Sequence, residues 1–190
     1  MVFLSADKLE KLENCDFTQS RLEEVRDCYI FCCYSGLPYL EMAALTRNHI
    51  TVGFDGNFWI NMYRQKTSKE LSIPLLPKAG RIIEKYNGVF DDDENIDNSH
   101  NKPLLPVISN QKFNSYLKEI ADIVGINKRL THHTARKTFA STVLLYNDVP
   151  MEIVSELLGH SKITMTQEHY GRVVKKKVSE EIKNLTEKLG

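Results

Sequence analysis

The spacing of apolar residues changes from a helical period to an alternating one and back, which limits the fold more than any other feature of this chain. The alternating stretch, residues 49–75, reads "HITVGFDGNFWINMYRQKTSKELSIPL" and is rich in β-branched and aromatic residues. Its "DGN" is a hairpin turn signal, and "KTSKE" predicts a second turn. We therefore expect a three-stranded antiparallel meander over roughly residues 50–75.

Helical spacing precedes this stretch. Ser5 is a suitable N-cap for a short helix that ends near Asn14. Apolar residues then recur from Leu22 to Cys33 on one face of a longer helix, which Gly36 ends. The run "YLEMAAL" predicts one more short helix before the sheet.

Helical spacing returns after the sheet in the segments "PKAGRIIEKYNG", "NQKFNSYLKEIADIVG", "TARKTFASTVLLY" and "MEIVSELL". We expect helix starts or caps at Asn110, at Thr131 and at Asp148 with Pro150, and helix ends at Gly88, Gly125 and Gly159. Between the first two segments, the acidic run from Asp91 to Asp97 predicts a loop that faces solvent.

The C-terminal part is predicted to hold two further helical pieces. Thr164 and Gln167 have capping-box spacing, so "MTQEHY" should begin a short turn of helix. A charged amphipathic tail helix should follow at about residues 173–190. The expected fold class is mainly α with a small three-stranded antiparallel β-sheet (α+β), as one domain over residues 1–190.

Composition narrows the class of protein but not its partner. The 25 basic and 25 acidic residues cancel, so net charge predicts nothing about a nucleic-acid partner. No apolar run approaches the roughly 18 residues needed to cross a bilayer, and the start shows no secretory signal. The four cysteines lack a zinc-like pair. We therefore expect a reduced, cytoplasmic protein with no membrane partner.

Five polar residues between positions 66 and 170 suit phosphate chemistry. His133 and Arg136 lie three apart at a helix start, where an anion is favoured. His160 follows a glycine helix stop, Tyr170 comes ten residues later, and Lys66 lies in the predicted turn of "YRQKTSKE". These groups can perform phosphoryl transfer without a metal, with the tyrosine as nucleophile and the cations stabilising the transition state.

The order Lys66, His133-x-x-Arg136, "LLGHS" with His160, and Tyr170 resembles the catalytic domain of the tyrosine recombinases, the phage-integrase family. The resemblance runs from about "FLSADKLEKL" to the tail. In detail the chain is most similar to integrases of conjugative transposons and related mobile elements of Bacteroides-type bacteria. The resemblance implies the DNA breaking-rejoining fold, double-stranded DNA as the partner, and no cofactor, metal or small-molecule substrate.

The resemblance also implies a role for each residue. Tyr170 would form a 3′-phosphotyrosyl link to DNA, and Lys66 would protonate the leaving 5′-oxygen. Arg136 would hold the scissile phosphate through bidentate hydrogen bonds. His133 would exchange a proton with the tyrosine, and His160 would donate a hydrogen bond to a non-bridging oxygen.

The chain departs from the family pattern at the position of a first arginine. That position, just after the turn in "YSGLPYLE", is Pro38, which cannot bind a phosphate. We predict that Arg26 supplies the missing contact, because it lies close to the apolar stripe of its helix near this turn. Arg21 and Arg47 are weaker candidates. The interval from His160 to Tyr170 is also one residue longer than the commonest pattern.

Three alternatives stay open from the sequence. The same fold can serve as a catalytically impaired DNA-binding module or as a regulator of assembly. A zinc site built from His132, His133, His160 and His169 is possible by residue type alone. The apolar stripe of the tail helix can dock on a neighbouring protomer on DNA or fold back onto its own core.

The resemblance also leads us to expect that the amino-terminal DNA-clamping domains of the family are absent.

Overall fold

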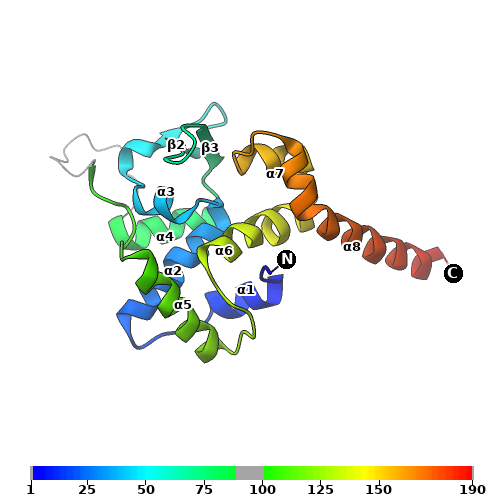
Figure 1. The fold of residues 1–190 in the computed structure, drawn as a ribbon, viewed down its shortest axis with the longest axis horizontal. Helices are drawn as coiled ribbons and strands as arrows, with labels where there is room; N and C mark the ends of the chain where they lie inside the picture. The colour runs from blue at the N-terminus through cyan, green and yellow to red at the C-terminus, as the bar shows by residue number, and fades with distance from the viewer. Residues whose placement is uncertain (1, 89–100, 190) are drawn as a thin grey trace.

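The computed structural model describes residues 2–88 and 101–189, and Figure 1 shows the predicted class, mainly helical with one small sheet. The helices are α1 (Ala6–Glu13), α2 (Ser20–Ser35), α3 (Tyr39–Ala43), α4 (Pro77–Asn87), α5 (Asn110–Val124), α6 (His132–Thr138), α7 (Met151–Leu157) and α8 (Ile163–Leu189). The strands are β1 (Ile50–Val52), β2 (Phe58–Tyr63) and β3 (Glu70–Pro74). The acidic run at Asp91–Asp97 lies outside the described residues.

Helix α2 forms the centre of the core and packs against α1, α4, α5 and α6. Leu22 and Tyr29 are buried, as the spacing predicts. Burial extends further round the helix than one apolar face, however, and includes Arg26 and Asp27, because other helices surround α2 on several sides. Gly36 ends the helix in the left-handed conformation, at φ +67°, as expected for a C-terminal glycine.

The three strands form the predicted antiparallel meander, in the order β1-β2-β3. Ile60 in the central strand pairs with Ile50 and Ile73. The alternate positions Ile60, Met62, Leu71 and Ile73 are buried, so one face of the sheet joins the core. Figure 1 shows β2 and β3 next to α7, and β3 contacts α7. The β2–β3 hairpin therefore lies beside the segment that leads from α7 to α8.

The helix predicted over "TARKTFASTVLLY" is not uniform. Helix α6 ends at Thr138. The chain then forms a π-helical turn over Phe139–Leu144 and a 3₁₀ turn over Leu145–Asn147. The N-terminal segment is fastened to this region, because the Leu4 N–H donates to Thr138 Oγ1 at 2.9 Å and the Thr142 hydroxyl donates to the Leu4 carbonyl. Local spacing cannot reveal such a distant partner.

The N-caps of α1 and α6 are Ser5 and Thr131, as the sequence predicts, whereas those of α5 and α7 differ from the prediction. Thr131 caps α6, with its hydroxyl accepting from the Thr134 N–H at 3.3 Å. The cap of α5 is Ser109, so Asn110 is already the first helical residue. Helix α7 starts after Pro150, whereas Asp148 lies outside it in the left-handed conformation, at φ +63°.

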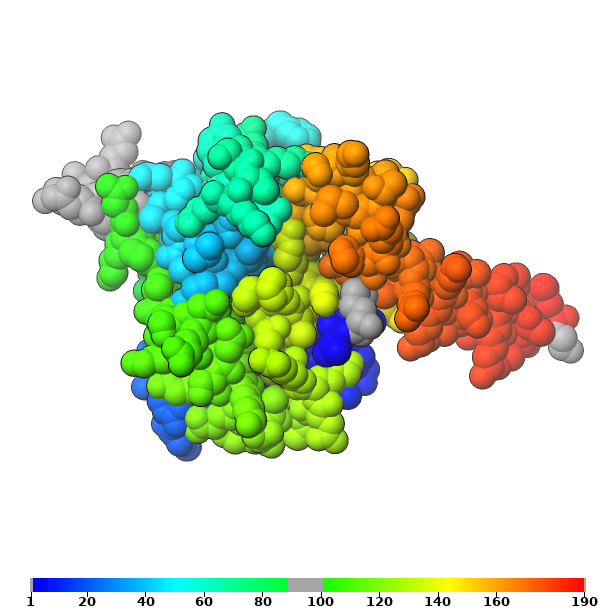
Figure 2. All heavy atoms as spheres, viewed as in Figure 1, coloured from blue at the N-terminus to red at the C-terminus, as the bar shows by residue number. Residues whose placement is uncertain are grey.

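The C-terminal part is one helix and not the two pieces that the sequence predicts. Helix α8 runs without a break from Ile163 to Leu189, and Thr164 lies inside its first turn. The Lys177 ammonium fastens it by donating to the Leu145 carbonyl at 3.1 Å and to Asp148 Oδ1 at 2.6 Å. Beyond this point α8 projects from the body as an arm (Figure 2).

None of the helices in residues 2–88 and 101–189 combines the length and the apolar character that crossing a membrane requires.

Candidate active site

Arg136 on α6 points at the ends of two other helices. Its Nη1 donates to the Gly36 carbonyl at 2.5 Å, just after α2, and its Nη2 donates to the Leu158 carbonyl, just after α7. Helix C-termini attract cations, so these carbonyls fix the guanidinium. A guanidinium has five N–H groups, and the remaining three can bind an anion. Burial lowers the pKa of Arg136 to about 10, so the group is still charged at neutral pH.

His160 follows the glycine that ends α7, and its orientation is fixed. Gly159 has φ +60°, and the His160 N–H donates to the Ser155 carbonyl at 3.0 Å. The ring Nδ1 lies 2.7 Å from Thr166 Oγ1, which leaves Nε2 for another partner. Burial lowers the pKa of His160 to about 4, and the charge of Arg136 contributes. The imidazole is therefore neutral at pH 7.

Tyr170 lies in the second turn of α8 and is only 4% exposed. Burial raises the pKa of its phenol, and the positive charge of Arg136 opposes that rise. The two side chains are thus close enough to interact electrostatically. The neighbouring His169 is exposed, with its ring centroid 6.4 Å from that of Tyr170. The structure therefore brings Arg136, His160 and Tyr170 together from α6, the α7–α8 turn and α8.

Two further predicted site residues, His133 and Lys66, are exposed. His133 is exposed on α6, and its ring centroid lies 4.0 Å from that of His132. Partial burial lowers the pKa of His133, and Lys137 and Arg136 lower it further. Lys66 is exposed in the turn between β2 and β3. Both side chains can therefore reach a ligand that lies against the protein surface.

Arg26 is not part of the cluster, which corrects the prediction made for it. Its Nη1 donates to the carbonyls of Glu13 at 3.0 Å and Cys15 at 2.7 Å, and its Nε donates to Asp27 Oδ1 at 2.6 Å. The guanidinium thus binds the C-terminal end of α1. Gly36, which borders the cluster, lies about 15 Å further along α2 at 1.5 Å per residue.

The weaker candidates are also engaged elsewhere. Arg21 pairs with Glu119 at 2.8 Å, and Arg47 donates to the Ile50 carbonyl at 3.2 Å. Pro38 occupies the N-cap of α3.

Three residues that the sequence did not single out surround the cluster. The Lys69 ammonium donates to the His160 carbonyl at 2.9 Å, which ties the β2–β3 hairpin to the α7–α8 turn. Glu41 on α3 is buried and accepts from the Gln65 N–H at 3.2 Å. The charge of Arg64, just after β2, lowers the pKa of both His160 and Arg136. Of these three residues, only Glu41 could have been noticed in the sequence, because it is an acidic residue inside the apolar run "YLEMAAL".

This arrangement combines cations, a neutral imidazole and a buried phenol. Cations with unused N–H groups bind an oxyanion, and a phenol beside them can act as a nucleophile toward phosphorus. In the described part of the chain, no three His, Cys, Asp or Glu side chains are grouped as metal ligands. The four histidines considered as zinc ligands therefore do not form such a group.

Comparisons with known proteins agree on one family. The profile of the phage integrase family matches residues 3–177. Tyrosine recombinase XerC of Rickettsia typhi is 30% identical over 173 residues, covering 88% of this chain and 52% of the relative. Tyrosine recombinase XerD of Halalkalibacterium halodurans is 35% identical over 143 residues, covering 70% and 44%. This chain thus spans about half the length of these curated relatives.

Solved structures share the fold. The catalytic domain of bacteriophage HP1 integrase has a TM-score of 0.62 at 20% identity, covering 96% of this chain and 94% of that one. XerH recombinase bound to its palindromic difH substrate has a TM-score of 0.68 at 15% identity, covering 95% and 52%. The Tn1549 transposon integrase in complex with circular intermediate DNA has a TM-score of 0.62 at 14% identity, covering 97% and 67%.

Proposed function

This chain belongs to the phage integrase family, and we propose that residues 1–190 act as the catalytic domain of a site-specific tyrosine recombinase. The observation that carries the proposal is the placement of Tyr170 within electrostatic reach of Arg136, a guanidinium with three N–H groups that the described residues leave unused. A phenol and a fixed cation at one place are the minimum that attack on a phosphodiester requires.

In the proposed cleavage step, Tyr170 Oη attacks the phosphorus and a new O–P bond forms as the bond to the 5′-oxygen breaks. The phenolic proton passes to His133, and Lys66 gives a proton to the leaving 5′-oxygen. The DNA 3′-end stays on the tyrosine, so the energy of the phosphodiester is kept for religation. Burial raises the pKa of Tyr170, which makes a proton acceptor necessary.

The remaining residues stabilise the charge that develops on the phosphate. Arg136 donates two hydrogen bonds to the non-bridging oxygens. His160 is neutral and held through Nδ1 by Thr166, so Nε2 can donate a further hydrogen bond. Because these groups are fixed before the substrate arrives, little reorganisation is needed in the transition state.

The substrate is double-stranded DNA in this proposal. The Tn1549 integrase structure of the same fold is a complex with circular intermediate DNA, and the XerH structure holds a palindromic difH substrate. We extend the proposal to an integrase of a mobile element of the type found in Bacteroides-type bacteria. The resemblance in the sequence supports this origin, as does the likeness to a transposon integrase.

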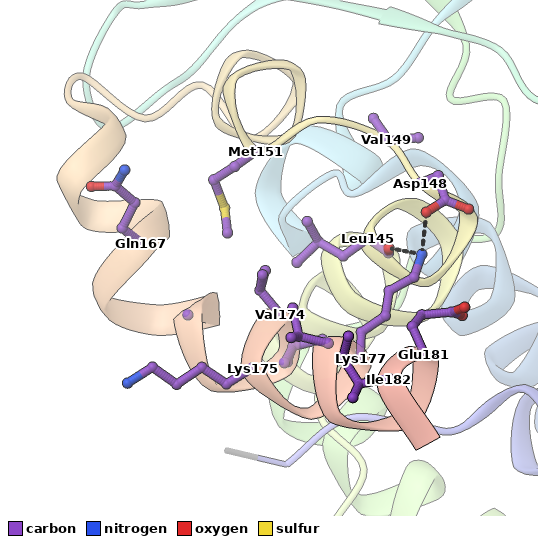
Figure 3. Close-up of a pocket in the computed structure, with 13 residues that line it drawn as sticks. Leu145, Asp148, Val149, Met151, Gln167, Val174, Lys175, Lys177, Glu181 and Ile182 are labelled. Atoms are coloured by element: carbon purple, nitrogen blue, oxygen red, sulfur yellow. Dashed lines mark hydrogen bonds and ion pairs between the residues drawn. The ribbon is translucent and has the colours of Figure 1, made fainter. Parts of the chain in front are cut away.

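Self-association through α8 is the second part of the proposal. The arm exposes Val178, Ile182 and Leu185, of which Ile182 is 56% exposed. A groove of about 770 Å³ runs between α8, from Gln167 to Ile182, and the segment that leads into α7, with Leu145 and Met151 on its wall (Figure 3). Unpaired apolar surface of this kind favours a protein partner. A neighbouring protomer on DNA would cover it.

The test uses a DNA duplex from the attachment site of the element that encodes the chain, nicked next to the cleavage point so that religation is blocked. We expect an SDS-resistant protein–DNA adduct that disappears in Tyr170→Phe. The matched control is Tyr63→Phe, since Tyr63 is 67% exposed on β2 and is not among the proposed site residues. An adduct that persists in Tyr170→Phe contradicts the assignment. Tight binding with no adduct from the parent chain favours the impaired DNA-binding module.

A further inference from the structure

Arg64 occupies a position fixed by the hairpin backbone. It directly follows β2, and its N–H donates to the Lys69 carbonyl at 2.8 Å while its own carbonyl accepts from the Ser68 N–H at 2.8 Å. The backbone on both sides is therefore held by the turn. The side chain is half-buried, and its Nε is enclosed without a hydrogen-bond partner among the described residues.

The side chain runs across the turn that presents His160. A Cβ placed on Gly159 would lie 3.5 Å from Arg64 Cδ, so the aliphatic part of Arg64 passes over that glycine. The charge of Arg64 also acts on two residues of the cluster. Burial and then Arg64 lower the pKa of Arg136, and Arg64 also contributes to the lowered pKa of His160. Arg64 thus lies beside two groups that the proposed mechanism places on the phosphate.

Two guanidinium groups held close together repel each other in a partly buried site. Glu41 is the carboxylate whose charge offsets this repulsion at Arg136, but it forms no ion pair with either arginine in the structure. An enclosed N–H without a partner adds a further cost. An oxyanion between the two arginines would remove both costs, because it accepts hydrogen bonds from each and cancels their charge.

We propose that Arg64 is the second guanidinium that binds the scissile phosphate, in place of the arginine that Pro38 excludes. The inference rests on the proposed function. It differs from the sequence prediction in origin as well as in residue: the contact comes from the β2–β3 hairpin and not from α2. Because Lys69 fastens the same hairpin to the His160 carbonyl, the two phosphate-binding elements are held in one arrangement.

The first experiment measures anion binding without DNA. Sodium sulfate, compared with sodium chloride at equal ionic strength, should raise the melting temperature of the parent chain and of Tyr170→Phe. We expect Arg64→Gln to bind sulfate at least tenfold more weakly. The matched control is Arg81→Gln, because Arg81 is an exposed arginine on α4. Sulfate that fails to stabilise the parent, or that stabilises Arg64→Gln as well as the parent, overturns the inference.

The second experiment uses the nicked DNA duplex. Loss of one donor to a developing oxyanion slows a reaction by about 100-fold or more. We expect that reduction in the rate of adduct formation for Arg64→Gln, and a smaller one for Arg64→Lys, which keeps the charge but not the fork of donors. Circular dichroism verifies that both variants fold. Adduct formation by Arg64→Gln at the parent rate contradicts the inference and leaves the proposed function intact, whereas absence of an adduct from the parent chain counts against the proposed function alone.

Discussion

At the scale of single residues, the orientation of His160 depends on one hydroxyl. Thr166 is fully buried, and its Oγ1 lies 2.7 Å from Nδ1 of the imidazole. A neutral imidazole has one N–H and one acceptor nitrogen, and the partner of one nitrogen determines what the other can do. We therefore predict that Thr166 is a positioning residue that acts through His160.

Thr166→Val removes this hydrogen bond and keeps the shape of the side chain. We expect about tenfold slower adduct formation on the nicked duplex, and a loss of stability of about 1 kcal/mol. Thr164→Val is the matched control, since Thr164 is exposed on the same helix. Equal rates for the two variants would contradict the positioning role.

The residues of the cluster differ in how far the sequence could predict them. Arg136, His160 and Tyr170 each belong to a short motif, so residue types and order indicated their chemistry. Arg26 was misplaced because helical spacing gives the angle of a side chain on its own helix, not the element that packs against it. Arg64 was missed because its neighbour, Gly159, is distant in the sequence and meets it only when β3 packs against α7.

At the scale of elements, the turn after α7 controls where His160 lies. Gly159 adopts φ +60°, and a Cβ there would lie 2.5 Å from Leu71 Cδ2. Glycine is therefore favoured at this position, because of its left-handed backbone and because a Cβ would displace the Leu71 methyl.

Gly159→Ala should destabilise the chain by about 1–3 kcal/mol, because it combines left-handed strain with a steric clash. The contrasting variant is Gly171→Ala in α8, where a Cβ would meet nothing within 4 Å. That change should stabilise the helix by roughly 0.5–1 kcal/mol. Urea unfolding of both variants measures the difference, and equal effects would contradict the role assigned to the turn.

Element boundaries show where local spacing is sufficient. The meander and α2 were predictable because alternation and glycine stops are local signals. The π-helical turn after α6 was not, since it lies where hydroxyl groups bind the Leu4 backbone. The continuity of α8 was missed because Thr164 and Gln167 have capping-box spacing inside a helix that had already begun.

At the scale of the whole molecule, two half-buried histidines link stability to pH. Burial lowers the pKa of both His132 and His160 to about 4. An unfolded chain has histidine pKa values of about 6.5, so it binds more protons than the folded chain between these values. The contribution of these two histidines to stability is therefore fully present above pH 6.5 and is lost as the pH falls toward 4.

The expected loss is on the order of 2 kcal/mol for each histidine, since one pKa unit corresponds to about 1.4 kcal/mol and partial exposure reduces the effect. Urea unfolding at a series of pH values measures it. His132→Gln should flatten the profile between pH 6.5 and 4. A profile that does not change in His132→Gln contradicts the assignment.

The arm of α8 yields a prediction about assembly. Ile182→Asp with Leu185→Asp should change the free energy of unfolding by less than about 0.5 kcal/mol, because both side chains are exposed. The double variant should assemble less well on DNA, as measured by analytical ultracentrifugation of the complex. Lys183→Glu, on the polar face, is the control for charge. A large drop in stability would indicate instead that the tail packs on its own domain.

The unbroken course of α8 joins the proposed nucleophile and the arm in one helix, which can act as a lever. Tyr170 lies about 10 Å on one side of Lys177, and the far end of the arm lies about 18 Å on the other, at 1.5 Å per residue. If Lys177 acts as the pivot, a tilt of roughly 10 degrees imposed by a neighbour on the arm displaces the phenol by about 2 Å. Under the proposed function, contact between copies would in this way be converted mechanically into the timing of strand cleavage.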